Sequence, residues 1–189
     1  GFAEVFFDEV SVPRENRLGE ENQGWKVAMA TAGFERGLML RSPARFQATA
    51  RRLVELYRKQ GAAPDPCLRD AVVRATMDAE AYSLNTYWTA SHLIAGGTIG
   101  AEASLNKIFW SEMDLRMHET ALALLGTRAE LVARARGAGD ELPAQAPGAG
   151  DAGGWLDGFL FSLAGPIYAG TNEIQRNVIA ERLLKLPRD

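Results

Sequence analysis

Apolar side chains recur every three or four residues along four long segments of the chain, with glycine or proline between the segments. This spacing is typical of amphipathic helices. We therefore expect helices over residues 23–40, 44–60, 68–95 and 100–125. Gly96 and Gly97 would end the third helix and Gly126 the fourth, as glycines commonly do. Long helices joined by short loops predict a mainly α fold, an antiparallel four-helix bundle.

The first residues follow a different pattern. Residues 2–12 are rich in aromatic and β-branched side chains and end at Pro13, which predicts one or two short strands. Two strands do not form a stable sheet alone. Because no other segment offers them a partner strand, and because the sequence begins at Gly1 without Met, we expect this chain to be part of a longer protein.

The region after the fourth helix has low complexity. Residues 137–154 contain six glycines and two prolines, and we expect a flexible loop because such a segment buries little apolar surface. A short helix over 155–163 and a last helix over 172–184 follow.

Residues 164–177 combine turn-forming residues with the start of the last helix. Gly170 permits a positive φ or a close approach of a ligand to the backbone. Thr171 or Asn172 is a suitable N-cap, and Asn172 and Gln175 have the spacing of a capping box. The free N–H groups at such a helix start favour an electron-rich ligand. An ordinary loop-to-helix junction would have the same residues, and the pattern leaves both interpretations open.

Charge and composition exclude several classes of function. The net charge of −3 gives no electrostatic footprint for nucleic acid. Cys67 is the one cysteine, which excludes an internal disulfide and fits a reducing, cytoplasmic compartment. No apolar run reaches membrane-spanning length. His92 and His118 are 26 positions apart without companion ligands, so we expect no metal site. A group of arginines could face phosphates or form a solvated helix surface: Arg41, Arg45, Arg51 and Arg52.

Several motifs occur in a characteristic order over nearly the whole chain. They are FFDEVSVP at 6–13, QGW at 23–25, ASLNKIFW at 103–110, LLG at 124–126 and YAGTNEIQRN at 168–177. In this order the chain resembles the C-terminal part of the acyl-CoA dehydrogenase family, FAD-dependent enzymes that desaturate acyl-CoA thioesters. The resemblance implies that residues 1–21 end a middle β-domain and that residues 22–189 form a C-terminal helical bundle domain.

In that family a glutamate removes the α-proton of the thioester while the β-hydrogen leaves as hydride to the flavin. Many members carry this base between the tyrosine and the glycine of the last motif, where this chain has Ala169. Isovaleryl-type and long-chain members carry it on the first long helix, directly before an arginine. Glu35, which precedes Arg36, matches that place and is the candidate base. The sequence pattern alone, without the resemblance, favours a solvated helix glutamate, paired to Arg36 or to nothing.

The resemblance also implies binding residues. Arg36 would contact the CoA part of the substrate, although a structural ion pair is an alternative. Tyr168 would also bind the substrate, and the backbone at Gly170 would approach the thioester. Two groups would contact FAD, the second of them from a neighbouring subunit: the helix start Thr171, Asn172 and Glu173, and the turn Leu124, Leu125, Gly126 and Thr127. Family members often have two glycines in that turn, where this chain has Gly126 followed by Thr127.

The resemblance implies a FAD-dependent acyl-CoA dehydrogenase of lipid metabolism, active as a dimer or tetramer of like or unlike chains. An acyl-CoA would be its substrate and an electron-transfer flavoprotein its electron acceptor. An oxidase shares the same motifs. Two further hypotheses stay open: a non-catalytic or half-site subunit of a hetero-oligomer, and a helical domain that only mediates assembly. A helix-borne base suggests long, branched or bulky acyl groups by analogy.

Overall fold

The computed structural model describes residues 3–38, 41–60, 65–130 and 152–187, with the side chains of all but residues 32–38, 130, 152 and 153. The chain divides into two compact units, Gly1–Leu38 and Met39–Asp189. None of the described helices is long and apolar enough to cross a membrane.

The first unit contains a short 3₁₀ helix, Arg14–Asn16, and helix α1, Gly24–Leu38. Residues 3–13 contain no strand, so the strands predicted over residues 2–12 are not found in the described part of this segment. Phe6 and Phe7 are exposed there. A strand is held by hydrogen bonds to a neighbouring strand, and the described residues offer none.

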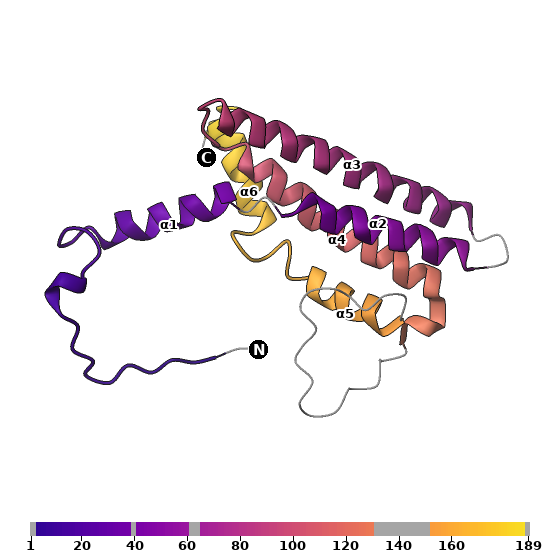
Figure 1. Ribbon diagram of the computed structural model, residues 1–189, viewed down its shortest axis with the longest axis horizontal. Coiled ribbons are helices and arrows are strands. Elements are labelled where there is room, and N and C mark those ends of the chain that lie inside the picture. Colours follow the sequence, from indigo (N-terminus) through magenta and orange to yellow (C-terminus); the bar gives the residue numbers. More distant parts are fainter. Residues whose placement is uncertain (1–2, 39–40, 61–64, 131–151, 188–189) are drawn as a thin grey trace. The chain divides into compact units, whose positions relative to one another are not determined.

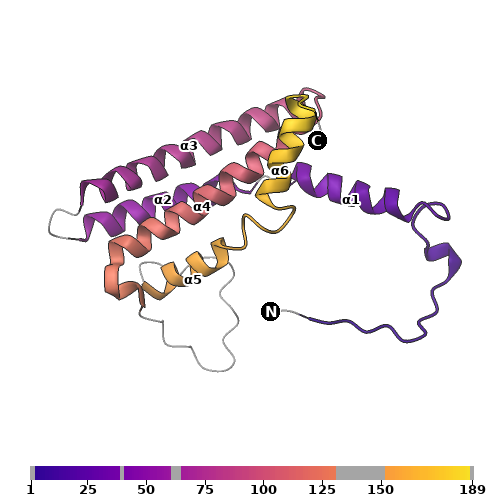
Figure 2. The same ribbon diagram turned by 180° about the vertical axis from the view of Figure 1, so that it is seen from behind.

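The second unit is the helical bundle. Its elements are α2 (Pro43–Arg58), α3 (Pro66–Ile94), α4 (Ala103–Leu125), a 3₁₀ helix (Gly126–Glu130), α5 (Ala152–Ser162), α6 (Asn172–Val178) and a π-helical turn (Ile179–Leu183). Helices α2, α3 and α4 run alongside one another, and α5 and α6 pack on α4 (Figures 1 and 2). The mainly α fold is confirmed.

The structure gives bounds for two of the predicted segments. The first predicted helix forms as α1, which is part of the first unit. The end of the predicted loop over 137–154 is helical, because α5 begins at Ala152; residues 137–151 lie outside the described residues.

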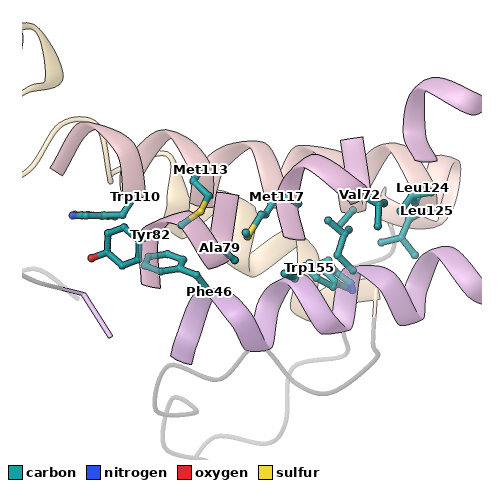
Figure 3. Close-up of a cluster of buried hydrophobic side chains, with 14 residues drawn as sticks. Phe46, Val72, Ala79, Tyr82, Trp110, Met113, Met117, Leu124, Leu125 and Trp155 are labelled. Atoms are coloured by element: carbon teal, nitrogen blue, oxygen red, sulfur yellow. The ribbon is translucent and has the colours of Figure 1, made fainter. Parts of the chain in front are cut away.

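Large aromatic and sulfur-containing side chains from four helices form the core of the bundle (Figure 3). Phe46 of α2 meets Tyr82 of α3 edge to face at a centroid distance of 5.1 Å. It also stacks at 6.4 Å on Trp110 of α4. Trp155 of α5 belongs to the same cluster and is 1% exposed.

Helix α4 is the central element, because it contacts α2, α3, α5 and α6. It buries polar side chains as well as apolar ones, including Ser104, Lys107, Ser111, Asp114 and His118. A polar side chain that is buried between packed helices needs a hydrogen-bond partner, which a neighbouring helix can supply.

Candidate functional site

The turn that joins α5 to α6 has an unusual backbone. Ala169 and Gly170 both have positive φ, 56° and 87°. Thr171 then caps α6, its hydroxyl accepting a hydrogen bond of 3.4 Å from the Ile174 N–H. The Asn172 N–H donates to the Pro166 carbonyl over 2.9 Å and closes the turn. Two left-handed residues followed by a cap fix the position of the backbone at Gly170.

A buried polar network fastens this turn to α4. Lys107 Nζ donates to Asn172 Oδ1 over 2.7 Å, and Asn172 Nδ2 donates to Ser111 Oγ over 3.1 Å. Ser104 Oγ donates to Gln175 Oε1 over 2.7 Å, and Gln175 Nε2 reaches back to the Ala169 carbonyl over 3.0 Å. Asn172 and Gln175 are 2% and 3% exposed. Side chains of α4 therefore hold the turn in position through hydrogen bonds to Asn172 and Gln175.

Asn172 and Gln175 have the spacing of a capping box, but in the structure they do not form one. Gln175 binds α4 and the turn instead of forming a capping box with Asn172, and Thr171 is the N-cap. The Asn172 side chain points into the bundle, so any contact of Asn172 with FAD would come from its backbone. The Glu173 carboxylate accepts from its own N–H and from Thr171, which lowers its pKa. The first N–H groups of α6 thus have partners within the chain.

Next to the turn, Tyr168 lies against an arginine and a tryptophan. The Arg41 guanidinium lies 5.5 Å from the centre of the Tyr168 ring and 4.9 Å from that of Trp110. Arg41 Nη2 also donates to the Tyr168 hydroxyl. Burial raises the pKa of Tyr168, so its hydroxyl is neutral at neutral pH. Tyr168, which is predicted to contact the substrate, therefore has the positive charge of Arg41 beside it.

Further along α4, Asp114 and His118 form a second buried pair. Arg45 Nη2 lies 3.0 Å from Asp114 Oδ2, and His118 Nδ1 donates to the Asp114 carbonyl over 2.8 Å. Burial lowers the pKa of His118, which is 2% exposed. The His118 Nε2 atom has no hydrogen-bond partner among the described residues and lies against Gly158 of α5. His118 is thus a neutral core residue beside Trp155, with ring centroids 5.6 Å apart.

The second predicted FAD-contacting group lies at the other end of α4. Leu124 and Leu125 are buried in the core, whereas Gly126, with φ 57°, and Thr127 are exposed. Asn172 contacts α4 at Ser111, 13 residues before Leu124. At 1.5 Å per residue the two groups are about 20 Å apart along the helix. One chain therefore does not bring both groups to the same part of a ligand.

The candidate base is on a separate element. Glu35 and Arg36 lie in α1, within the first unit, and their side chains are outside the described residues. The arginines considered together in the sequence do not form one patch: Arg41 stacks on Tyr168, Arg45 pairs with Asp114, and Arg51 lines a groove between α2 and α3. No cluster of metal-ligating side chains occurs among the described residues.

Sequence patterns alone did not single out Lys107 as a functional residue. A detectable signal existed, because Ser104, Lys107 and Ser111 repeat at helical spacing within an apolar helix. Their partners, Asn172 and Gln175, follow more than sixty positions later, so only the fold brings these groups together.

Comparison with known proteins decides the family. The model of the acyl-CoA dehydrogenase C-terminal domain matches residues 22–184. The chain belongs to the acyl-CoA dehydrogenase family. It is 33% identical over 189 residues to acyl-CoA dehydrogenase IpdE1 of Mycolicibacterium smegmatis, covering all of this chain and 43% of that relative. It is 31% identical over 138 residues to the human mitochondrial very long-chain specific acyl-CoA dehydrogenase, covering 66% of this chain and 20% of that relative.

Solved structures of the family have the same fold. The crystal structure of the ChsE4–ChsE5 complex from Mycobacterium tuberculosis matches with a TM-score of 0.72 and 29% identity, over 94% of this chain and 45% of that one. The Tcur3481–Tcur3483 steroid ACAD matches with a TM-score of 0.77 at 23% identity, over 97% of this chain and 45% of that one. This acyl-CoA dehydrogenase chain thus spans less than half the length of these relatives.

Proposed function

We propose that this chain is the C-terminal part of a FAD-dependent acyl-CoA dehydrogenase subunit that uses Glu35 as the α-proton base. The observation that carries the proposal is that Ala169, in the turn between α5 and α6, occupies the position where many family members have the base. The nearby Glu173 is a poor substitute, because hydrogen bonds to its carboxylate lower its pKa and make it a weaker base.

The chain's own residues would have separate tasks in this reaction. Glu35 would take the α-proton, and Arg36 would bind the CoA part of the substrate. The backbone at Gly170 would support the thioester, because the network from Lys107 to Asn172 fixes that backbone. When bound, FAD would accept the hydride from the β-carbon.

The residues around the turn suit a flavin. Ile167 and Ile174, on either side of the turn, are 66% and 51% exposed, and they offer apolar surface for an aromatic ring system. Thr171 and Glu173 would contact the cofactor at its polar edge. The exposed Gly126 and Thr127 at the far end of α4 would contact a second flavin, since they are about 20 Å from the turn along the helix.

This separation supports an oligomer in which each flavin site takes residues from two chains. Helix α3 has the surface for such assembly. Its exposed apolar side chains recur at helical spacing, namely Val73, Met77, Leu84 and Trp88. The similarity to the ChsE4–ChsE5 complex favours an oligomer of unlike chains. An electron-transfer flavoprotein would reoxidise the flavin. A subunit that holds only half of a site is therefore the second candidate function.

The test uses the full-length protein with the substitution Glu35→Gln. We expect flavin to stay bound while anaerobic reduction by acyl-CoA slows at least about a hundredfold, because a general base is lost. Glu119→Gln, on the exposed face of α4, is the matched control and should reduce normally. Undiminished reduction in the Glu35→Gln protein would refute the assignment of the base.

A partner dependence is tested separately. If the full-length wild-type chain binds flavin but is reduced only after a partner chain is added, it is a half-site subunit. A full-length chain that never binds flavin, alone or with partners, would instead be an assembly domain.

A further inference from the structure

Arg41 is held in place by three aromatic side chains. Its guanidinium lies over the rings of Trp110, at 4.9 Å, and Tyr168, at 5.5 Å, which are themselves in contact, and it donates to the Tyr168 hydroxyl. The Tyr82 hydroxyl donates to the Arg41 carbonyl over 2.9 Å. Burial raises the pKa of Tyr82 to about 12, so this hydroxyl keeps its proton. Both the backbone and the side chain of Arg41 are therefore preorganised.

The charge of Arg41 is not balanced within the described part of the chain. Asp114 is the carboxylate whose charge reaches Tyr168, and it forms its ion pair with Arg45 at 3.0 Å. Arg41 makes no ion pair with any described residue. Since burial lowers the pKa of His118, that ring adds no charge at neutral pH. Among the described charges that act on Tyr168 are two guanidinium groups, Arg41 and Arg45, and one carboxylate, Asp114, which pairs with Arg45; the charge of Arg41 is therefore left beside Tyr168.

An arginine of this kind suits one class of ligand. The planar guanidinium fork matches carboxylate and phosphate oxygens and forms two hydrogen bonds with them at once. Arg41 is only partly exposed, and partial burial strengthens such a bond relative to water. One N–H of the guanidinium is used by Tyr168, which leaves other donors for a ligand.

We propose that Arg41, packed against Trp110 and Tyr168, binds an oxyanion of the acyl-CoA substrate. The oxyanion would be a carboxylate on the acyl group or a phosphate of CoA. The proposal rests on the proposed function, because the turn that contains Tyr168 is assigned there to the thioester. It adds a binding site for a negatively charged group of the substrate, which the proton transfer and the hydride transfer do not themselves require.

The experiment measures binding of four probes to the full-length holoenzyme by equilibrium dialysis, without an electron acceptor. The probes are valeryl-CoA, glutaryl-CoA and the pantetheine thioesters of the same two acyl groups. Arg41→Gln should weaken binding of the oxyanion-bearing probes roughly tenfold to a hundredfold, as expected for loss of charge-assisted hydrogen bonds. Arg51→Gln makes the same change of charge on an exposed part of α2 and should change nothing.

The pattern of losses identifies the source of the oxyanion. Weaker binding of both CoA esters with unchanged pantetheine esters assigns Arg41 to a CoA phosphate. Weaker binding of glutaryl-pantetheine but not of valeryl-pantetheine assigns it to an acyl carboxylate. Equal losses for all four probes, or no loss, would overturn the proposal.

Two further measurements keep the proposal testable if Arg41→Gln does not fold and separate it from the proposed function. Arg41→Lys keeps the charge but not the fork, so it should bind the oxyanion probes with intermediate affinity, and it serves if Arg41→Gln does not fold. Reduction of the wild-type flavin by the same esters reports on the proposed function. If the protein binds the probes through Arg41 but its flavin is not reduced, the oxyanion site is supported and the proposed dehydrogenase function is contradicted.

Discussion

Lys107 Nζ lies 2.7 Å from Asn172 Oδ1, although 65 positions separate the two residues. Both side chains are buried, at 7% and 2% exposed. Burial lowers the pKa of Lys107, opposed by the charges of Glu173 and Glu112. This contact ties the start of α6 to the centre of the bundle, so it couples the stability of the fold to the position of the turn at Gly170.

Removing the Lys107 ammonium should leave the buried Asn172 Oδ1 with only the longer, 3.3 Å hydrogen bond from Ser111 Oγ. We expect Lys107→Met to lower the free energy of unfolding by about 2–3 kcal/mol, as for other buried hydrogen bonds to charged groups. Urea unfolding measures it, with Lys59→Met on an exposed position as control. The double variant Lys107→Met, Asn172→Leu should recover part of the loss, because the buried amide that has lost its charged partner is then removed as well. A double variant that is as unstable as the sum of the single ones would contradict this explanation.

The two left-handed residues of the turn should respond in opposite directions. At Gly170 an added Cβ would come within 2.7 Å of Gln175 Nε2, and φ is 87°, so Gly170→Ala should destabilise by at least about 1 kcal/mol. At Ala169, glycine relieves the strain of φ 56° at some cost in unfolded-chain entropy, so Ala169→Gly should be neutral or slightly stabilising. Thermal unfolding of both variants tests the pair. Equal destabilisation would show that the turn is less constrained than the backbone angles indicate.

His118 should make the fold sensitive to acid. Because burial lowers its folded pKa below the unfolded value of about 6.5, the unfolded chain takes up a proton first as the pH falls. Stability should therefore be constant above about pH 6.5 and fall below it, by at most about 1.4 kcal/mol per pH unit.

Urea unfolding between neutral and mildly acidic pH measures this dependence. His118→Gln should flatten it, whereas His92→Gln, at an exposed position, should preserve it. If the slope persists in His118→Gln, another group is responsible for it.

Gly158 should be intolerant of any side chain. A Cβ there would lie 2.4 Å from His118 Nε2, inside the contact between α4 and α5. We expect Gly158→Ala to cost about 1–3 kcal/mol despite the better helix propensity of alanine. Adding His118→Ala to Gly158→Ala should restore part of the stability by removing the clash. Without such recovery, the cause would be elsewhere than in the His118 ring.

The sequence by itself determined the helices over 44–60, 68–95 and 100–125, because apolar periodicity and glycine or proline boundaries are local signals. It also determined the family, through motifs such as YAGTNEIQRN at 168–177, which the match over residues 22–184 confirms. It did not determine strands at 2–12, because β structure depends on a partner.

Only the tertiary structure decided what the residues of the turn do. Asn172 and Gln175 have a local capping pattern, yet their side chains bind Lys107 and Ser104 of α4. In the same way, Arg41 is one of several arginines in the sequence, and packing alone places it against the rings of Trp110 and Tyr168. The physical reason is that a buried polar group takes whichever partner the fold brings within hydrogen-bond distance, and that partner can be distant in the sequence.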